Sequence, residues 1–119
     1  MNETRRKRLE ARILRLVAEL SIKGLKDPHI GFTTFTSCTL SNDGSHATIK
    51  VSVFEEPEEK IKTLKALHRA AGYLQHRISG NLQTKVVPRL HFELDESLDR
   101  AEGIEKLIDD SQDDNSEEN

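Results

Sequence analysis

Histidine is the residue type in this chain best suited to acid–base chemistry, and the chain has five histidines. Catalysis would need a partner beside one of them, such as a carboxylate that orients the ring. No acidic residue lies near His68 or His76 in the sequence, and no HxxxH pair with a glutamate is present. We therefore predict that the protein is not an enzyme and uses no metal or other cofactor.

The single cysteine adds no reactive chemistry to this picture. Cys38 cannot form an internal disulfide, and the chain has no Cys-x-x-Cys pair to hold structural zinc. Its position within a predicted strand is typical of a small core residue.

The strongest chemical signal is a stretch of positive charge. Residues 60–92 contain seven Lys or Arg side chains, three histidines and no acidic residue. Such a stretch repels itself unless a polyanion neutralises it, so phosphate groups are its natural ligands. A solvated basic helix face is the alternative, because a charge cluster alone is only an electrostatic footprint. A second cluster favours nucleic-acid binding: Arg5, Arg6, Lys7, Arg8, Arg12 and Arg15.

Gly72 lies between Arg69 and His76 in a segment with the apolar spacing of a helix. A helical glycine costs about 1 kcal/mol relative to alanine, so the position predicts a kink or a close approach to the backbone. A kink would expose amides that can hold a phosphate oxygen. The alternative is a glycine tolerated for helix packing.

Two common modes of RNA binding do not fit the sequence. No two glycines are three residues apart, so the GxxG loop of an ordinary KH domain is absent. The four phenylalanines are few and are partly needed for the core, so base stacking is not expected to be the main mode.

The formal net charge of −3 conceals two opposite parts. Residues 1–92 hold 16 basic and 9 acidic side chains, whereas residues 93–119 hold 2 basic and 12 acidic ones. We predict one domain over residues 1–108 and a disordered acidic tail over residues 109–119, which contain no apolar residue. No apolar run is long enough to span a bilayer, so we expect a soluble, cytoplasmic protein.

Apolar periodicity predicts the elements of an α+β domain. A helix is expected at about residues 4–23, followed by a hairpin of strands over 32–40 and 46–54. A helical stretch then begins at Pro57 and is expected to form two shorter helices that meet near residues 70–72. Residues 86–94 are expected to form a strand, at a sheet edge because of Pro88. A short helix is expected after Ser97.

Several segments together resemble the bacterial ribosome-binding factor A family. They are Arg5 to Arg8, Asp27-Pro28-His29-Ile30-Gly31, Ala70-Ala71-Gly72, and Pro88 through Ser97. The resemblance covers residues 5–108 and implies a type II KH-like fold in which an Ala-x-Gly kink, Ala70 to Gly72, replaces the glycine loop. It also implies binding to the maturing small (30S) ribosomal subunit through 16S rRNA near its 3′ end, with assistance to rRNA processing and to growth in the cold.

The candidate RNA-binding residues combine the kink implied by the resemblance with the two basic clusters. They are Arg5, Arg6, Lys7, Arg8, Arg12, Lys62, Lys65, Arg69, Ala70, Ala71, Gly72, His76, Arg77, Lys85 and Arg89. We expect a monomer with no membrane partner. A general RNA chaperone that is not specific to ribosomes is the alternative function, and a processing nuclease is a further one that the isolated histidines disfavour.

Overall fold

A computed structural model describes residues 2–25, 30, 33–53, 56–82 and 87–96 of the chain. Its elements are α1 (Glu3–Gly24), β1 (Thr33–Leu40), β2 (His46–Val53), α2 (Pro57–Ser79) and β3 (Arg89–Leu94). The α+β class and the order helix, strand, strand, helix, strand are therefore confirmed. The predicted helix after Ser97, the domain boundary at residue 108 and the acidic tail lie outside the described residues.

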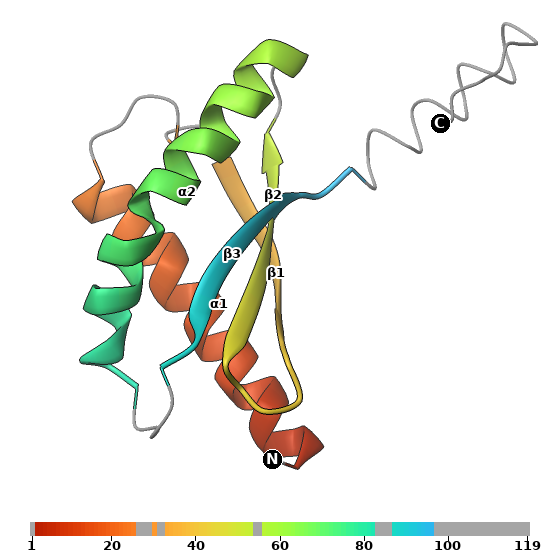
Figure 1. Cartoon of the computed structure of the whole chain (residues 1–119), viewed down its shortest axis with the longest axis vertical. Coiled ribbons are helices and arrows are strands. Elements are labelled where there is room, and N and C mark those ends of the chain that lie inside the picture. Colours follow the sequence, from red (N-terminus) through yellow and green to blue (C-terminus); the bar gives the residue numbers. More distant parts are fainter. Residues whose placement is uncertain (1, 26–29, 31–32, 54–55, 83–86, 97–119) are drawn as a thin grey trace, which may run out of the picture.

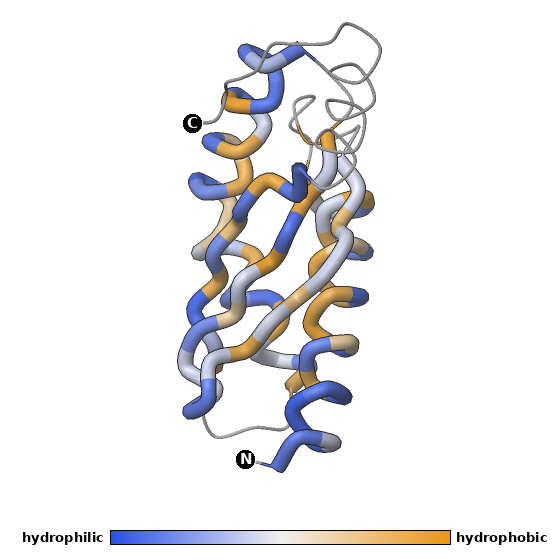
Figure 2. Tube along the Cα trace, turned by 90° about the vertical axis from the view of Figure 1, so that its right-hand side faces the viewer, coloured by the Kyte–Doolittle hydropathy of each residue, from blue (hydrophilic) through white to orange (hydrophobic). Residues whose placement is uncertain are grey.

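Both helices lie on one side of a three-stranded sheet with the order β1-β2-β3 (Figure 1). β1 runs antiparallel to β2, as predicted for a hairpin, whereas β3 runs parallel to β2. β3 is an edge strand that begins directly after Pro88, which agrees with the prediction from that proline. Figure 2 looks onto the uncovered face of the sheet, and its colours show polar and apolar residues alternating along the strands.

The core lies between the sheet and the two helices. Alternate residues of β2, Ala47, Ile49 and Val51, point into it and are fully buried. The helices contribute side chains at helical spacing to the same core, namely Ile13 and Val17 from α1 and Ala66, Leu67, Leu74 and Ile78 from α2. No helix within the described ranges is both long and apolar enough to cross a membrane.

The sequence prediction of two helices around Gly72 is wrong. Residues 57–79 form one unbroken helix of 23 residues, although its ribbon changes direction near the middle (Figure 1). A single glycine costs the helix only about 1 kcal/mol. Leu67 on one side of Gly72 and Leu74 on the other are both fully buried in the same core, and this packing outweighs the local cost.

The turn between β1 and β2 is fixed by a carboxylate and a glycine. Asp43 accepts hydrogen bonds from the Ser41 hydroxyl (2.8 Å) and from the Ser45 amide (3.0 Å) and hydroxyl (2.7 Å). These bonds, first those from Ser45, lower the pKa of Asp43 to about 2. Gly44 has a φ of 76°, in the left-handed region that glycine adopts without strain.

We expect Gly44→Ala to lower the free energy of unfolding by about 1–2 kcal/mol, because a Cβ is disfavoured at positive φ. Gly80→Ala is the matched control. Gly80 has a φ of −72°, and an added Cβ would meet only the Arg77 carbonyl oxygen, at 3.8 Å. Urea denaturation of the two variants should show a loss for Gly44→Ala alone, and equal midpoints would contradict the role of the turn.

Cys38 is a core residue, as the sequence predicted. Its side chain is buried within β1 and belongs to the hydrophobic core. Burial, with a smaller contribution from the Glu10 carboxylate, raises the pKa of the Cys38 thiol to about 12. Because the thiolate is the reactive form, this cysteine is chemically inert at neutral pH.

Candidate nucleic-acid interface

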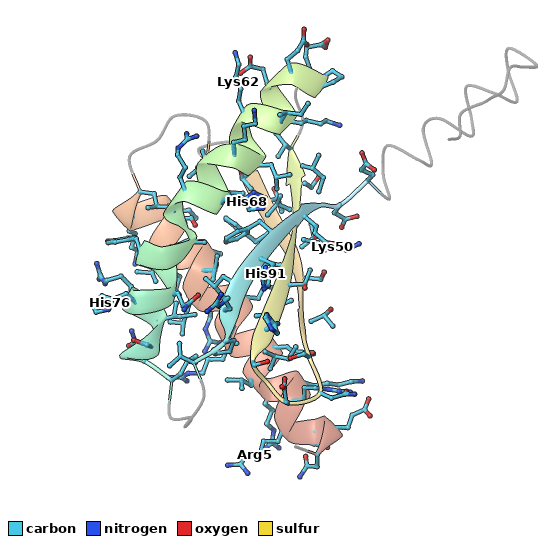
Figure 3. The ribbon with its side chains drawn as sticks, in the orientation of Figure 1. Arg5, Lys50, Lys62, His68, His76 and His91 are labelled. Carbon is cyan, nitrogen blue, oxygen red and sulfur yellow. The ribbon has the colours of Figure 1, made fainter. Side chains whose placement is uncertain are left out.

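Four basic residues of α2 lie on the side of the helix that faces away from the core. Five exposed positions follow one another at intervals of three or four residues: Lys62, Lys65, Arg69, Gly72 and His76. The opposite side is buried against the sheet. Figure 3 shows His76 directed outward and Lys62 near the other end of α2. We call this row, together with Arg77, the α2 basic face.

Gly72 leaves the backbone bare at the middle of the α2 basic face. A Cβ built at this position would have no heavy atom of the described residues within 4 Å, so none of the described elements needs the glycine for close packing. The adjacent Ala70 and Ala71 are half-buried and pack against the core. The packing explanation for Gly72 is therefore not supported, and a ligand can approach the helix closely here.

The idea that amides at a kink hold a phosphate is wrong. α2 continues through Gly72, so no second helix begins there and no helix N-terminus is presented on the basic face. Any phosphate contact at this place must come from the side chains around the glycine, such as Arg69 and His76.

The basic cluster of α1 is divided between exposed and structural roles. Arg5, Lys7 and Arg8 are exposed. Arg12 is also exposed, but its guanidinium is used within the fold and donates from Nε (3.2 Å) and Nη2 (2.7 Å) to the carbonyl oxygen of Asn81. This contact places the middle of α1 beside the segment that follows α2.

Other candidates lie elsewhere in the fold. Arg6 donates to the Asn42 side chain in the hairpin turn at 3.0 Å, and Arg5 lies at the opposite end of the molecule from Lys62 (Figure 3). Arg89 alternates with the buried Leu90 and is exposed, so it lies on the uncovered face of the sheet, away from the α2 basic face. Lys85 lies outside the described residues.

Among the described histidines, His46 and His91 contact each other, whereas His68 contacts the backbone of the sheet. The His68 ring is held by the sheet, with Nε2 at 3.0 Å from the Phe92 carbonyl oxygen. His46 and His91 form a pair on the uncovered face, with Nδ1 of His46 2.9 Å from Nε2 of His91. Within the described ranges, no three His, Cys, Asp or Glu side chains gather to form a metal site.

The sequence reasoning missed Tyr73. Its side chain is 41% exposed on the outer side of α2, next to Gly72. Arg77 lies one helical turn later, donates from Nη1 to the Tyr73 hydroxyl at 2.8 Å, and has its guanidinium carbon 5.7 Å from the ring centroid. The i, i+4 spacing of Tyr73 and Arg77 is the signal that could have identified this pair.

The phenylalanines, by contrast, serve the core as predicted where they are described. Phe92 is buried and contacts the half-buried Phe35 edge to face, with ring centroids 6.4 Å apart. Phe32 and Phe54 lie outside the described residues.

Comparison with known protein families gives one consistent match. A family model described as ribosome-binding factor A matches residues 5–108. The ribosome-binding factor A of Staphylococcus epidermidis is 32% identical over 108 residues, which cover 91% of this chain and 93% of that protein. That of Neisseria gonorrhoeae strain FA 1090 is 38% identical over 105 residues, covering 88% of this chain and 85% of the relative.

Solved structures give the same match. The crystal structure of ribosome-binding factor A from Thermus thermophilus superposes with a TM-score of 0.66 at 34% identity, covering 75% of this chain and 94% of the other. A homology model of the Thermus thermophilus protein, fitted into the cryo-EM map of its complex with the 30S subunit, superposes with a TM-score of 0.61 at 34% identity and covers 75% and 93%.

Proposed function

Because this chain belongs to the ribosome-binding factor A family, we propose that it binds the small (30S) ribosomal subunit and assists its maturation without catalysing a reaction. The match to a relative fitted into a map of its 30S complex supports this proposal, since the aligned parts of the two chains are 34% identical. The match spans 93% of that relative and 75% of this chain, so the likeness is not confined to a short segment.

The observation that carries the proposal is the α2 basic face. Its cations are exposed along one side of a rigid helix, and Gly72 leaves the backbone accessible between them. Phosphate contacts from such a row would provide affinity, while the shape of the surface would position the protein on folded rRNA. The carboxylates of the first turn, Glu58 and Glu59, lie only at the N-terminal end of α2.

The finer parts of the proposal come from the resemblance. We place the contact on 16S rRNA near its 3′ end, and we assign the protein to the cytoplasm as a monomer that assists precursor processing and growth in the cold. We also assign a type II KH-like fold, which the order of the elements and the parallel pairing of β2 with β3 support. In this assignment the segment Ala70 to Gly72 stands where other KH domains carry their glycine loop.

Co-sedimentation with purified small subunits tests the function. We expect the full chain to pellet with small subunits at moderate salt and to be released as salt increases, because phosphate contacts exchange with counterions. Large ribosomal subunits at the same concentration serve as the control for nonspecific adsorption. Pelleting that does not respond to salt would contradict a phosphate-based interface.

Competition separates a ribosome factor from a general RNA chaperone. A chaperone would bind unrelated single strands about as well as subunits, so excess bulk RNA would remove it from the pellet. We expect a factor specific for the small subunit to remain bound under those conditions. Equal affinity for both would support the chaperone instead.

A further inference from the structure

Tyr73 is an exposed aromatic residue among the basic residues of α2. It is 41% exposed, whereas Leu74, the next residue along α2, is fully buried. Arg69, Tyr73 and Arg77 follow one another at i, i+4 along the helix, and Gly72 and His76 form the neighbouring row. The ring therefore lies between cations on both sides and beside the uncovered backbone of Gly72.

Arg77 holds the ring in a defined position. Its guanidinium group donates to the Tyr73 hydroxyl at 2.8 Å, and its central carbon lies 5.7 Å from the ring centroid. Both groups are planar, and each restricts the rotamers of the other before any ligand arrives. Such preorganisation lowers the entropic cost of binding a flat ligand.

We propose that Tyr73 and Arg77 form a stacking site for one unpaired nucleobase of RNA. Unpaired bases stack on aromatic rings and on arginine guanidinium planes, and the surrounding cations attract the flanking phosphates. Gly72 lets the sugar-phosphate backbone of that nucleotide approach the helix, because a Cβ there would be the only protein atom in the space. The inference rests on the proposed RNA-binding function and names the chemical group that the α2 basic face receives.

This site agrees with the prediction that base stacking is not the main mode of binding. It accommodates one base, and most of the affinity still comes from phosphate contacts. A protein partner is the competing ligand for an exposed tyrosine. The positions on either side of it favour RNA, because Arg69, His76 and Arg77 carry donors and no acidic residue accompanies them between Lys60 and Phe92.

Intrinsic fluorescence can test the site directly, because the chain has one tyrosine and no tryptophan. Its tyrosine emission therefore comes from Tyr73 alone. We expect a short unlabelled single-stranded RNA to quench this emission with the same midpoint as binding measured by filter retention, because a stacked base quenches tyrosine. N-acetyltyrosinamide with the same RNA corrects for light that the RNA absorbs. The same RNA with abasic sites should bind about tenfold more weakly and quench little.

Two variants complete the test. Tyr73→Phe loses the hydroxyl bond but keeps the ring beside the Arg77 guanidinium, so it should bind RNA within about threefold of the parent, whereas Tyr73→Leu loses the ring and should lose about tenfold. Tyr73→Leu should also no longer distinguish intact from abasic RNA. Circular dichroism checks that both variants fold, and the abasic comparison with the parent protein decides the matter if either does not.

The outcomes distinguish this inference from the function on which it rests. RNA binding without quenching, and with equal affinity for intact and abasic RNA, would overturn the stacking site and leave the function in place. Weaker binding to abasic RNA together with quenching by intact RNA would support the stacking site. If the parent protein binds neither the RNA nor small subunits, the proposed function fails and the inference fails with it.

Discussion

Reversing the charges of Lys65 and Arg69 together is expected to weaken binding to small ribosomal subunits on the order of a hundredfold at moderate salt. Both side chains are exposed on consecutive turns of the α2 basic face. The double variant Lys65→Glu/Arg69→Glu removes two of the phosphate contacts that we propose and introduces repulsion at the same places. The dependence of log affinity on log salt should become shallower by about two. Co-sedimentation over a range of salt concentrations measures both quantities.

The matched control changes the net charge equally at positions outside the candidate RNA-binding residues. Lys23→Glu/Lys50→Glu alters two exposed cations, where Lys23 belongs to α1 and Lys50 to β2. We expect this variant to lose less than about threefold at the same salt, since long-range effects of exposed charges are screened. Equal losses in the two variants would mean that overall charge, and not the α2 basic face, governs binding. Binding of Lys65→Glu/Arg69→Glu that equals the parent's would contradict the interface itself.

The elements of the fold could be predicted because their signals are local. Strict alternation from Ala47 to Val53 identified β2, and the Ser41–Gly44 turn identified its hairpin with β1. Pro88 marked an edge strand because proline cannot donate to a neighbouring strand. The parallel pairing of β3 with β2 could not be derived in this way, because it depends on how α2 crosses the sheet.

The prediction of two helices meeting near Gly72 failed because it rested on the low helix preference of glycine. Packing against distant parts of the chain keeps the helix continuous instead. The sequence shows the cost of a helical glycine, but the burial of Leu67 and Leu74 on the same core appears only in the folded chain. Long-range contacts also limit what the sequence could predict about the candidate site. The sequence located the basic residues of α2, but it could not show that Arg12 is used to bond Asn81, which is 69 positions away in the chain.

Exposure was the other quantity that the sequence could not supply. Tyr73 and Phe92 are both aromatic residues in predicted elements, yet one is 41% exposed and the other 2%. His68 and His76 lie eight positions apart on one helix, but the His68 ring is fixed to β3 whereas His76 points outward (Figure 3). Helical spacing gives the relative direction of two side chains, and only the packing of the helix shows which direction leads to solvent.

Two substitutions of Gly72 are expected to separate its effect on stability from its effect on binding. Gly72→Ala should raise the free energy of unfolding by about 1 kcal/mol, because alanine is the better helix former and its Cβ enters open space. The corresponding rise in melting temperature is about 4–8 °C for a domain of this size.

Gly72→Val should leave stability nearly unchanged, since valine is only slightly better than glycine in a helix. Its two methyl groups should nevertheless weaken subunit binding by about tenfold, because they occupy the space through which the RNA backbone approaches.

Gly80→Val is the control for this steric effect, because it replaces another exposed glycine with the same residue. Gly80 is also exposed, follows α2 directly, and has room for a side chain, since its Cβ would lie 3.8 Å from the nearest carbonyl oxygen. Thermal denaturation and co-sedimentation of all three variants should show reduced binding for Gly72→Val alone. A folded Gly72→Val protein that binds subunits as well as the parent would remove Gly72 from the interface. Gly72 lowers helix stability, and none of the described neighbouring elements requires it. RNA contact is the explanation that we propose for it, so this single variant decides whether the uncovered backbone of α2 serves binding.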